Sequence, residues 1–180
     1  MFELGNMKRA RRTGWWVAGV RDPESLAEHS HRASLLGAVL AGLEGADPAR
    51  TTMLAALHDV PETRTGDIPL VGKSYVTAVD PKEVLEDQLA GCPDEVAEPF
   101  RQALAEFEEG ETPEARCAKD ADKLEALIQA VEYKHAGMGT IDEWINSSLE
   151  ALRTDSAKSV AAAILDGEPL AWQHARADRP

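Results

Sequence analysis

The stretch that decides the fold runs from residue 47 to residue 62 and reads DPARTTMLAALHDVPE. Asp47 before Pro48 is typical of a helix start, because the aspartate accepts unpaired backbone N–H groups and the proline presets φ. Apolar residues follow at helical spacing up to Leu57. Pro61 then favours a helix end or a kink. The stretch therefore predicts a buried helix that ends in polar side chains.

Three other places pair a capping side chain with a following proline. They are Asp22-Pro23, Asp80-Pro81 and Thr112-Pro113. A helical pattern of apolar residues follows each pair, and similar patterns cover residues 93–109, 140–153 and 155–166. The longest expected loop covers residues 61–79. Because sustained alternation typical of strands is absent, the sequence predicts an all-α fold of seven or eight helices.

Length and composition limit the class of protein. The chain has 180 residues, of which 43% are apolar and 28% charged, so it can bury the core of one domain. We expect this domain to cover residues 1–167 and a tail to cover residues 168–180. The net charge of −13 argues against nucleic-acid polymers and anionic membranes as partners. It does not exclude a small anionic substrate, because a bound metal ion or a few local cations can override it.

Signals for export or membrane insertion are missing from the sequence. No apolar run approaches the roughly 18 residues that a membrane-spanning helix needs. The apolar stretch at residues 15–20 is short and two charged residues follow it, unlike a signal peptide. Cys92 and Cys117 lack the spacing of a zinc or redox motif. We therefore expect a cytoplasmic protein.

Histidine and carboxylate side chains fall at positions that can carry chemistry. His29 completes the apolar stripe of the first long predicted helix, where a histidine is more often a hydrogen-bonded core residue than a ligand. His58 and Asp59 end the next helix, and Glu62 follows on an adjoining part of the same face. The loop beyond it supplies Asp67. These residues are a candidate site at the end of a helix.

A further acid, Asp122, borders the apolar stripe of another predicted helix. Burying an unpaired charge is costly, so this carboxylate needs Lys119, Lys123 or a metal ion as its partner. Together, two imidazoles and two carboxylates from three helices suit one divalent ion, such as Co²⁺, Mn²⁺, Mg²⁺, Fe²⁺, Ni²⁺ or Zn²⁺. Four protein ligands leave positions open for water and a substrate oxygen. Glu62 and Asp67 are then candidates for proton transfer.

The order of these residues resembles the H…HD…D pattern of the HD-domain metal-dependent phosphohydrolases. Five flanking words look like the 5′-deoxynucleotidase branch of that superfamily. They are Arg12-Thr13-Gly14-Trp15, Pro23-Glu24-Ser25-Leu26-Ala27-Glu28-His29-Ser30, His58-Asp59-Val60-Pro61-Glu62, Thr65-Gly66-Asp67-Ile68-Pro69 and Lys119-Asp120-Ala121-Asp122-Lys123. They occur in the expected order over roughly residues 7–135.

The resemblance implies a compact HD domain with a metal site between its helices, usually in a homodimer. It implies that metal-activated water removes the 5′-phosphate from (deoxy)ribonucleoside 5′-monophosphates. The implied metal ligands are His29, His58, Asp59 and Asp122. The acid–base steps would fall to Glu62 and Asp67, with the two roles unassigned.

The resemblance also implies how substrate would be held. Trp15 would lie against the nucleotide, and the sugar and phosphate would be lined by Asp67, Ile68, Pro69 and Leu70. A bacterial form of the family has an arginine directly before this tryptophan, whereas this chain has Gly14. The phosphate contact would then come from elsewhere, with the candidates Arg12, Lys73 and Lys123.

Three alternative functions stay open at this point. One is an HD phosphohydrolase that acts on another phosphorylated metabolite, such as a nucleoside di- or triphosphate, a cyclic dinucleotide or an alarmone. Another is an HD-type di-iron oxygenase, although the sequence shows no second cluster of histidines and carboxylates. The last is a non-catalytic regulatory HD domain, against which the complete set of ligands and acids argues.

Overall fold

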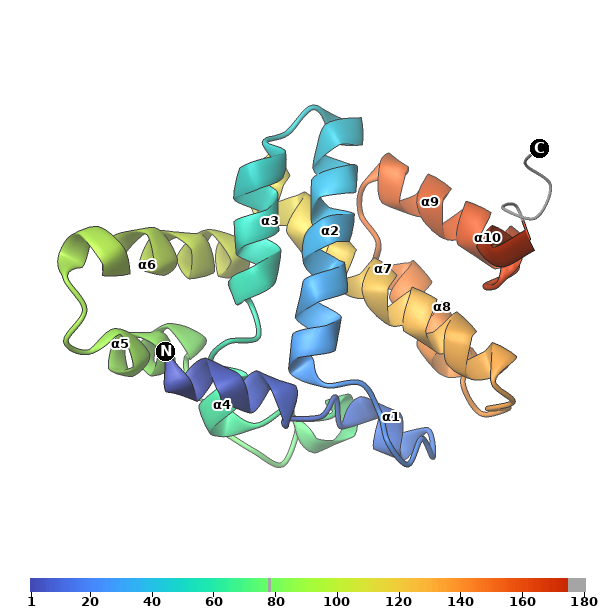
Figure 1. The fold of residues 1–180 in the computed structure, drawn as a ribbon, viewed down its shortest axis with the longest axis horizontal. Coiled ribbons are helices and arrows are strands. Elements are labelled where there is room, and N and C mark those ends of the chain that lie inside the picture. Colours follow the sequence, from blue (N-terminus) through green and yellow to red (C-terminus); the bar gives the residue numbers. More distant parts are fainter. Residues whose placement is uncertain (78, 175–180) are drawn as a thin grey trace.

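The computed structural model describes residues 1–77 and 79–174. Within these residues the fold is all-α and no strand is present, as predicted (Figure 1). The longer helices are α2 (Leu26–Glu44), α3 (Pro48–Leu57), α5 (Pro81–Leu89), α6 (Asp94–Glu109), α7 (Pro113–His135), α8 (Asp142–Ala151) and α9 (Asp155–Asp166). Short turns of helix are η1 (Phe2–Lys8), α1 (Gly14–Val17), α4 (Glu62–Thr65), η2 (Leu70–Gly72) and α10 (Ala171–His174).

The seven longer helices among the described residues agree with the predicted number. The predicted loop at residues 61–79 contains α4 and η2. Of the predicted tail at 168–180, the first part carries α10, and residues 175–180 lie outside the described residues. None of the described helices combines the length and the apolar character that crossing a membrane requires.

Three of the four predicted proline-linked caps are present. The Asp47 side chain accepts from the backbone N–H groups at the start of α3, and Asp80 does the same for α5. The hydroxyl of Thr112 accepts from the N–H of Ala115 at the start of α7. Each cap satisfies N–H groups that have no partner within the helix, so it defines where the helix begins.

The fourth predicted cap is wrong. Helix α2 begins at Leu26, and its cap is Ser25 rather than Asp22. Ser25 and Glu28 form a reciprocal capping box, in which each side chain accepts from the backbone N–H of the other residue. Asp22 instead lies 3.0 Å from the guanidinium of Arg11. The box prevails because it satisfies two N–H groups at once.

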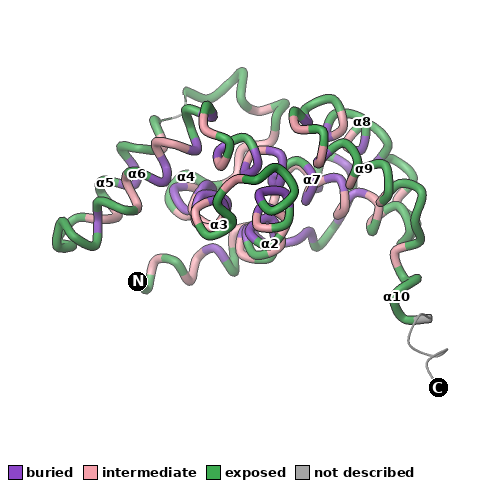
Figure 2. Tube along the Cα trace, turned by 90° about the horizontal axis from the view of Figure 1, so that it is seen from above, coloured by how far each residue is buried: buried purple, intermediate pink, exposed green. Residues whose placement is uncertain are grey.

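Helices α2, α3 and α7 form the centre of the molecule (Figure 1), and buried residues concentrate on them (Figure 2). Leu40, Leu54 and Leu124 are fully buried between these helices. At Gly37 an added Cβ would lie 3.1 Å from the side chain of Thr51, so glycine permits the close approach of α2 and α3. This packing places the N-terminal part of α2 beside the end of α3 and the middle of α7.

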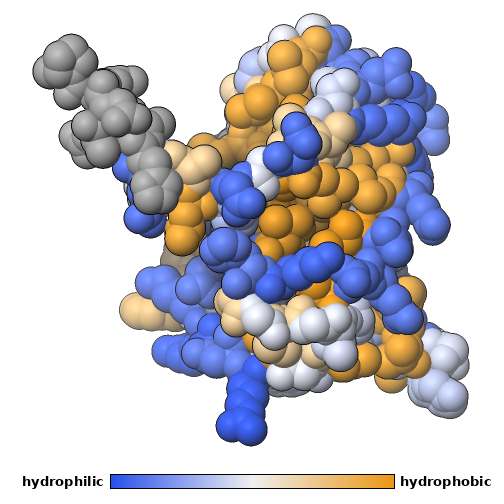
Figure 3. Space-filling model, turned by 90° about the vertical axis from the view of Figure 1, so that its right-hand side faces the viewer, coloured by the Kyte–Doolittle hydropathy of each residue, from blue (hydrophilic) through white to orange (hydrophobic). Residues whose placement is uncertain are grey.

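The remaining segments surround this centre. Helix η1 packs against α2 and α4, and the N–H of Arg12 donates to the carbonyl of Glu24. Helices α5 and α6 extend on one side, and α8 and α9 on the other (Figure 1). On the latter side, apolar side chains gather at the surface (Figure 3). Half-buried apolar residues of α7, α8 and α9 include Ile128, Val131, Leu149, Val160 and Ile164.

Candidate active site

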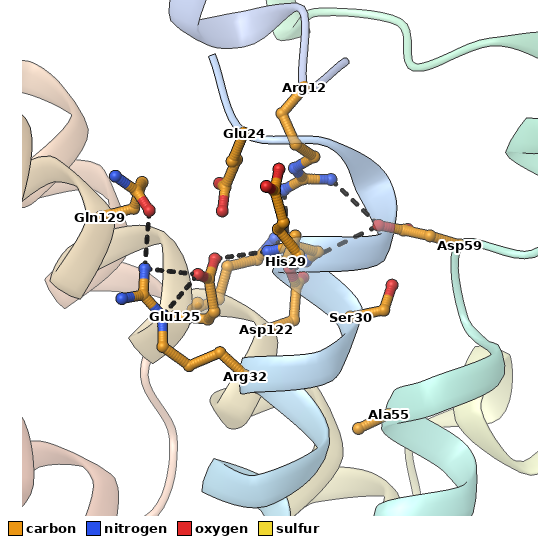
Figure 4. Close-up of polar contacts among 12 residues, drawn as sticks. Arg12, Glu24, His29, Ser30, Arg32, Ala55, Asp59, Asp122, Glu125 and Gln129 are labelled. Atoms are coloured by element: carbon orange, nitrogen blue, oxygen red, sulfur yellow. Dashed lines mark hydrogen bonds and ion pairs between the residues drawn. The ribbon is translucent and has the colours of Figure 1, made fainter. Parts of the chain in front are cut away.

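Three elements bring the candidate metal ligands together. His29 comes from α2, His58 and Asp59 follow the last turn of α3, and Asp122 comes from α7. His29 Nε2 lies 3.1 Å from Asp122 Oδ1 and 3.6 Å from Asp59 Oδ2. His58 Nε2 lies 3.1 Å from Asp59 Oδ1. All four side chains are buried, and Figure 4 shows how His29, Asp59 and Asp122 point toward one another.

Several atoms of this cluster are buried without a hydrogen-bond partner. They are Nε2 of His29, Nε2 of His58 and Oδ1 of Asp122. The aspartate oxygen lies 3.1 Å from the first nitrogen and 3.8 Å from the second, and neither contact is a hydrogen bond. The other atoms of the same groups are satisfied. His58 Nδ1 donates to the carbonyl of Ala55 (2.7 Å), and Lys123 donates to Asp122 Oδ2 (2.8 Å).

Buried polar groups are nearly always paired, so unpaired imidazole nitrogens that share one space with carboxylate oxygens need an explanation. Nitrogen and oxygen donors of this kind suit a divalent ion. His29, His58 and Asp59 each offer an atom within 4.8 Å of the others. The arrangement of the donor atoms therefore fits the ion that the sequence predicts, with one oxygen of Asp122 facing the same space.

The N-terminal segment contributes one positively charged side chain, Arg12, to this cluster. The Arg12 guanidinium lies 3.2 Å from Asp59 Oδ2, 3.6 Å from Asp67 Oδ1 and 3.7 Å from Asp122 Oδ1. Burial lowers the pKa of Arg12, but these carboxylates outweigh burial and raise it. Burial and Arg12 likewise lower the pKa of His29, and Asp122 and Glu125 raise it to about 10. A metal ion that binds His29 at Nε2 would displace any proton from that nitrogen.

The two proton-transfer candidates flank the cluster and have different surroundings. The Asp67 carboxylate accepts from the N–H of Thr13 and from its hydroxyl (2.7 Å). Glu62 has one buried carboxylate oxygen without a partner. Burial, with Asp59 and Asp67 nearby, raises the pKa of Glu62 to about 9. Glu62 therefore holds a proton at neutral pH, and Asp67 is held as an acceptor.

The residues predicted to contact substrate lie at different depths. Trp15 is 3% exposed, and its Nε1 donates to Glu24 (2.9 Å) while its ring contacts Tyr133 edge-on. Its neighbour Trp16 is 52% exposed. In the loop, Ile68 and Pro69 are half-buried, whereas Leu70 and Lys73 are exposed. Of the three phosphate candidates, Arg12 and Lys123 reach the cluster of acids.

Sequence reasoning missed two residues beside the cluster. Glu125 is fully buried, and it accepts from His29 Nδ1 and from Arg32 Nε (2.9 Å). Spacing contains a signal, since Glu125 follows Asp122 by three positions and Arg32 follows His29 by three, which places each pair on one helix face. A pocket of about 480 Å³ reaches Glu125 and Arg32 but none of the four candidate ligands.

The helical bundle and the meeting of histidine, histidine–aspartate and aspartate from three elements define an HD domain. The family model described as an HD domain matches residues 4–164, and the chain belongs to this family. A conserved hypothetical protein from Pyrococcus furiosus has a similar structure, with a TM-score of 0.75 and 28% identity over 92% of this chain and 97% of that one.

Curated relatives place the chain in the 5′-deoxynucleotidase branch, as the sequence motifs predict. The chain is 31% identical to 5′-deoxynucleotidase HDDC2 of Dictyostelium discoideum, over 72% of this chain and 73% of the relative. It is 29% identical to 5′-deoxynucleotidase hdd1 of Schizosaccharomyces pombe, over 77% of this chain and 73% of the relative.

Proposed function

We propose that this protein is a metal-dependent phosphoric monoester hydrolase that removes the 5′-phosphate from (deoxy)ribonucleoside 5′-monophosphates. The observation that carries the proposal is the set of unpaired donor atoms from His29, His58 and Asp122 in one buried cluster. Its relatives in the 5′-deoxynucleotidase branch supply the class of substrate.

His29, His58, Asp59 and Asp122 would hold one divalent ion. When bound, such an ion acts as a Lewis acid toward a phosphate oxygen and lowers the pKa of bound water. We leave the identity of the ion open among Co²⁺, Mn²⁺, Mg²⁺, Fe²⁺, Ni²⁺ and Zn²⁺, because a mixed set of nitrogen and oxygen donors suits them all.

Glu62 and Asp67 would move the protons. The raised pKa of Glu62 suits it to donate a proton to the departing 5′-oxygen. Asp67 receives two hydrogen bonds from Thr13, which orient its carboxylate to accept a proton from the attacking water. Glu62 would then start the reaction with the proton that the leaving group needs.

Arg12 is the best candidate to bind the phosphate, since this chain has Gly14 where a bacterial form of the family has an arginine. It contacts three carboxylates of the site, whereas Lys123 pairs with Asp122 at its edge. A divalent ion would share the negative charge of these acids, and the guanidinium would be free to pair with phosphate, whose geometry it matches.

Nucleotide hydrolysis by reconstituted protein tests the proposal. Metal-stripped protein is supplied with Co²⁺ or Mn²⁺ and assayed for phosphate release from a panel that includes dAMP and dCMP, with the D59A variant as control. We expect metal-dependent release by the wild type and none by D59A. A panel of 5′-monophosphates that stays inert with every divalent ion would overturn the nucleotidase assignment.

The organisation of the chain is also proposed. We infer one catalytic domain over residues 1–167, a tail over residues 168–180, a cytoplasmic location and a homodimer. The partly exposed apolar side chains of α7, α8 and α9 support self-association (Figure 3). Light scattering at several protein concentrations tests the homodimer, and a mass of 19.5 kDa at all of them would contradict it.

A further inference from the structure

His29 is held from the side opposite to the candidate metal site. Its Nδ1 donates to the carboxylate of Glu125, and both side chains are fully inaccessible to solvent. The contact joins α2 to α7, and Figure 4 shows the Glu125 carboxylate beside the imidazole ring. Because the two ring nitrogens point in opposite directions, this bond directs Nε2 toward Asp59 and Asp122.

Glu125 is in turn held by Arg32. Arg32 Nε lies 2.9 Å and Nη2 lies 2.7 Å from Glu125 Oε1. The same guanidinium donates to Glu132 (2.8 Å) and to Gln129 (2.8 Å), both on α7. One oxygen of Glu125 thus faces Arg32 and the other faces His29, so the carboxylate has little freedom to rotate.

The neighbouring acids do not make this a second cation site. Glu24, His29 and Glu125 offer atoms within 4.8 Å of one another. However, Glu24 Oε1 accepts from Trp15, and both oxygens of Glu125 are used by His29 and Arg32. Hydrogen bonds thus engage three of the four carboxylate oxygens of Glu24 and Glu125, in contrast to the unpaired atoms on the other side of His29.

We propose that Glu125 is a positioning residue for the metal site and that Arg32 fixes its orientation. Glu125 keeps the proton of His29 on Nδ1, presents the lone pair of Nε2 to the ion, and makes that nitrogen a stronger donor. Carboxylates that bind a ligating histidine in this way generally contribute 10- to 100-fold to metal affinity. The proposal rests on the proposed function, in which His29 binds the metal ion.

Binding of Co²⁺ to the metal-stripped full-length chain tests the proposal without any measure of turnover. The Kd is measured by calorimetry, and the visible absorption of bound Co²⁺ reports its coordination. We expect E125A to raise the Kd about 10- to 100-fold and to shift the absorption bands. E125Q should fall between E125A and the wild type, because its amide oxygen can still accept from Nδ1.

E132Q is the matched control. Glu132 also lies on α7 and also pairs with Arg32, but no contact joins it to His29, so its Kd should stay within about twofold of the wild type. If E125A does not fold, the comparison of E125Q with E132Q decides the question.

Two results would count against the account, and they differ. Equal Co²⁺ affinity and equal spectra for wild type, E132Q and the Glu125 variants would overturn the positioning role alone. A wild-type protein that binds no Co²⁺ would overturn the proposed metal-dependent function, and the positioning role with it.

Discussion

Asp120 and Asp122 lie two residues apart on α7, are both buried, and have opposite surroundings. Asp120 accepts from the N–H groups of Arg153 (3.0 Å) and Thr154 (2.7 Å) and from the hydroxyl of Thr154 (2.7 Å). Asp122 has one oxygen paired with Lys123 and the other unpaired between two histidines. The complete pairing of Asp120 fits a structural role, and the unpaired oxygen of Asp122 fits the metal ligand that we propose.

The sharpest contrast in Co²⁺ affinity should come from replacing Asp122 and, in a second variant, Asp120 with asparagine. D122N removes a proposed metal ligand, so Co²⁺ affinity and phosphate release should both fall by at least about 100-fold. D120N should leave the Co²⁺ affinity of the folded protein nearly unchanged, and lower the free energy of unfolding by about 1–3 kcal/mol through weaker charged hydrogen bonds. Calorimetric titration and urea unfolding of both variants check this. Equal Co²⁺ affinity and equal stability of the two variants would contradict the different roles given to Asp120 and Asp122.

Loss of Glu62 should separate chemistry from metal binding within the open cluster. E62Q cannot transfer a proton, so kcat for a nucleoside monophosphate should fall by about 10²- to 10⁴-fold. The Co²⁺ affinity should change little, because Glu62 is outside the proposed ligand set. Steady-state kinetics beside a Co²⁺ titration measures both. Full turnover in E62Q would exclude Glu62 from the acid–base steps.

Loss of Arg12 should weaken substrate binding. Hydrogen bonds to charged groups contribute about 1.5–3 kcal/mol, so R12Q should raise KM by roughly 10- to 150-fold. R11Q is the control, because the neighbouring Arg11 pairs with Asp22 and with the carbonyl of Pro23, outside the cluster. A KM that rises equally in both variants would indicate a general effect of the N-terminal segment.

The smallest effect concerns Glu3, a paired acid outside the proposed set of metal ligands and proton-transfer residues. Glu3 accepts from Arg64 (2.6 Å) and Gln88 (2.8 Å), which lower its pKa from 4.5 to about 2. Its stabilisation is complete above pH 4.5 and is lost as the pH falls toward 2. E3Q should therefore be less stable by about 0.5–1 kcal/mol at pH 7, and the difference should shrink by pH 3. Thermal unfolding at several pH values measures it, and a constant difference would contradict this reading.

Much of the fold could be predicted because the signals are local. The cap before Pro48 and the apolar spacing after it define α3 within a few residues, and they place His58-Asp59 at its end. The cap at Asp22 was predicted wrongly, since the Ser25–Glu28 box competes for the same helix start.

The roles around His29 were harder to predict. Its position on an apolar stripe favours a core residue over a ligand, and the ring is indeed buried, but Nε2 has no hydrogen-bond partner, as expected of the proposed ligand. Glu125 and Arg32 meet only when α2 packs on α7, 93 positions apart in sequence. A residue-by-residue pattern does not contain that contact.

The most direct test of the central claim is a titration of metal-stripped protein with Co²⁺ while phosphate release from dAMP is followed. The unpaired atoms of one buried cluster predict activity that rises from zero and saturates at one Co²⁺ per chain in the wild type, and that stays at zero in D59A. Full activity of the stripped wild type in the presence of a chelator, or undiminished turnover by D59A, would contradict the account.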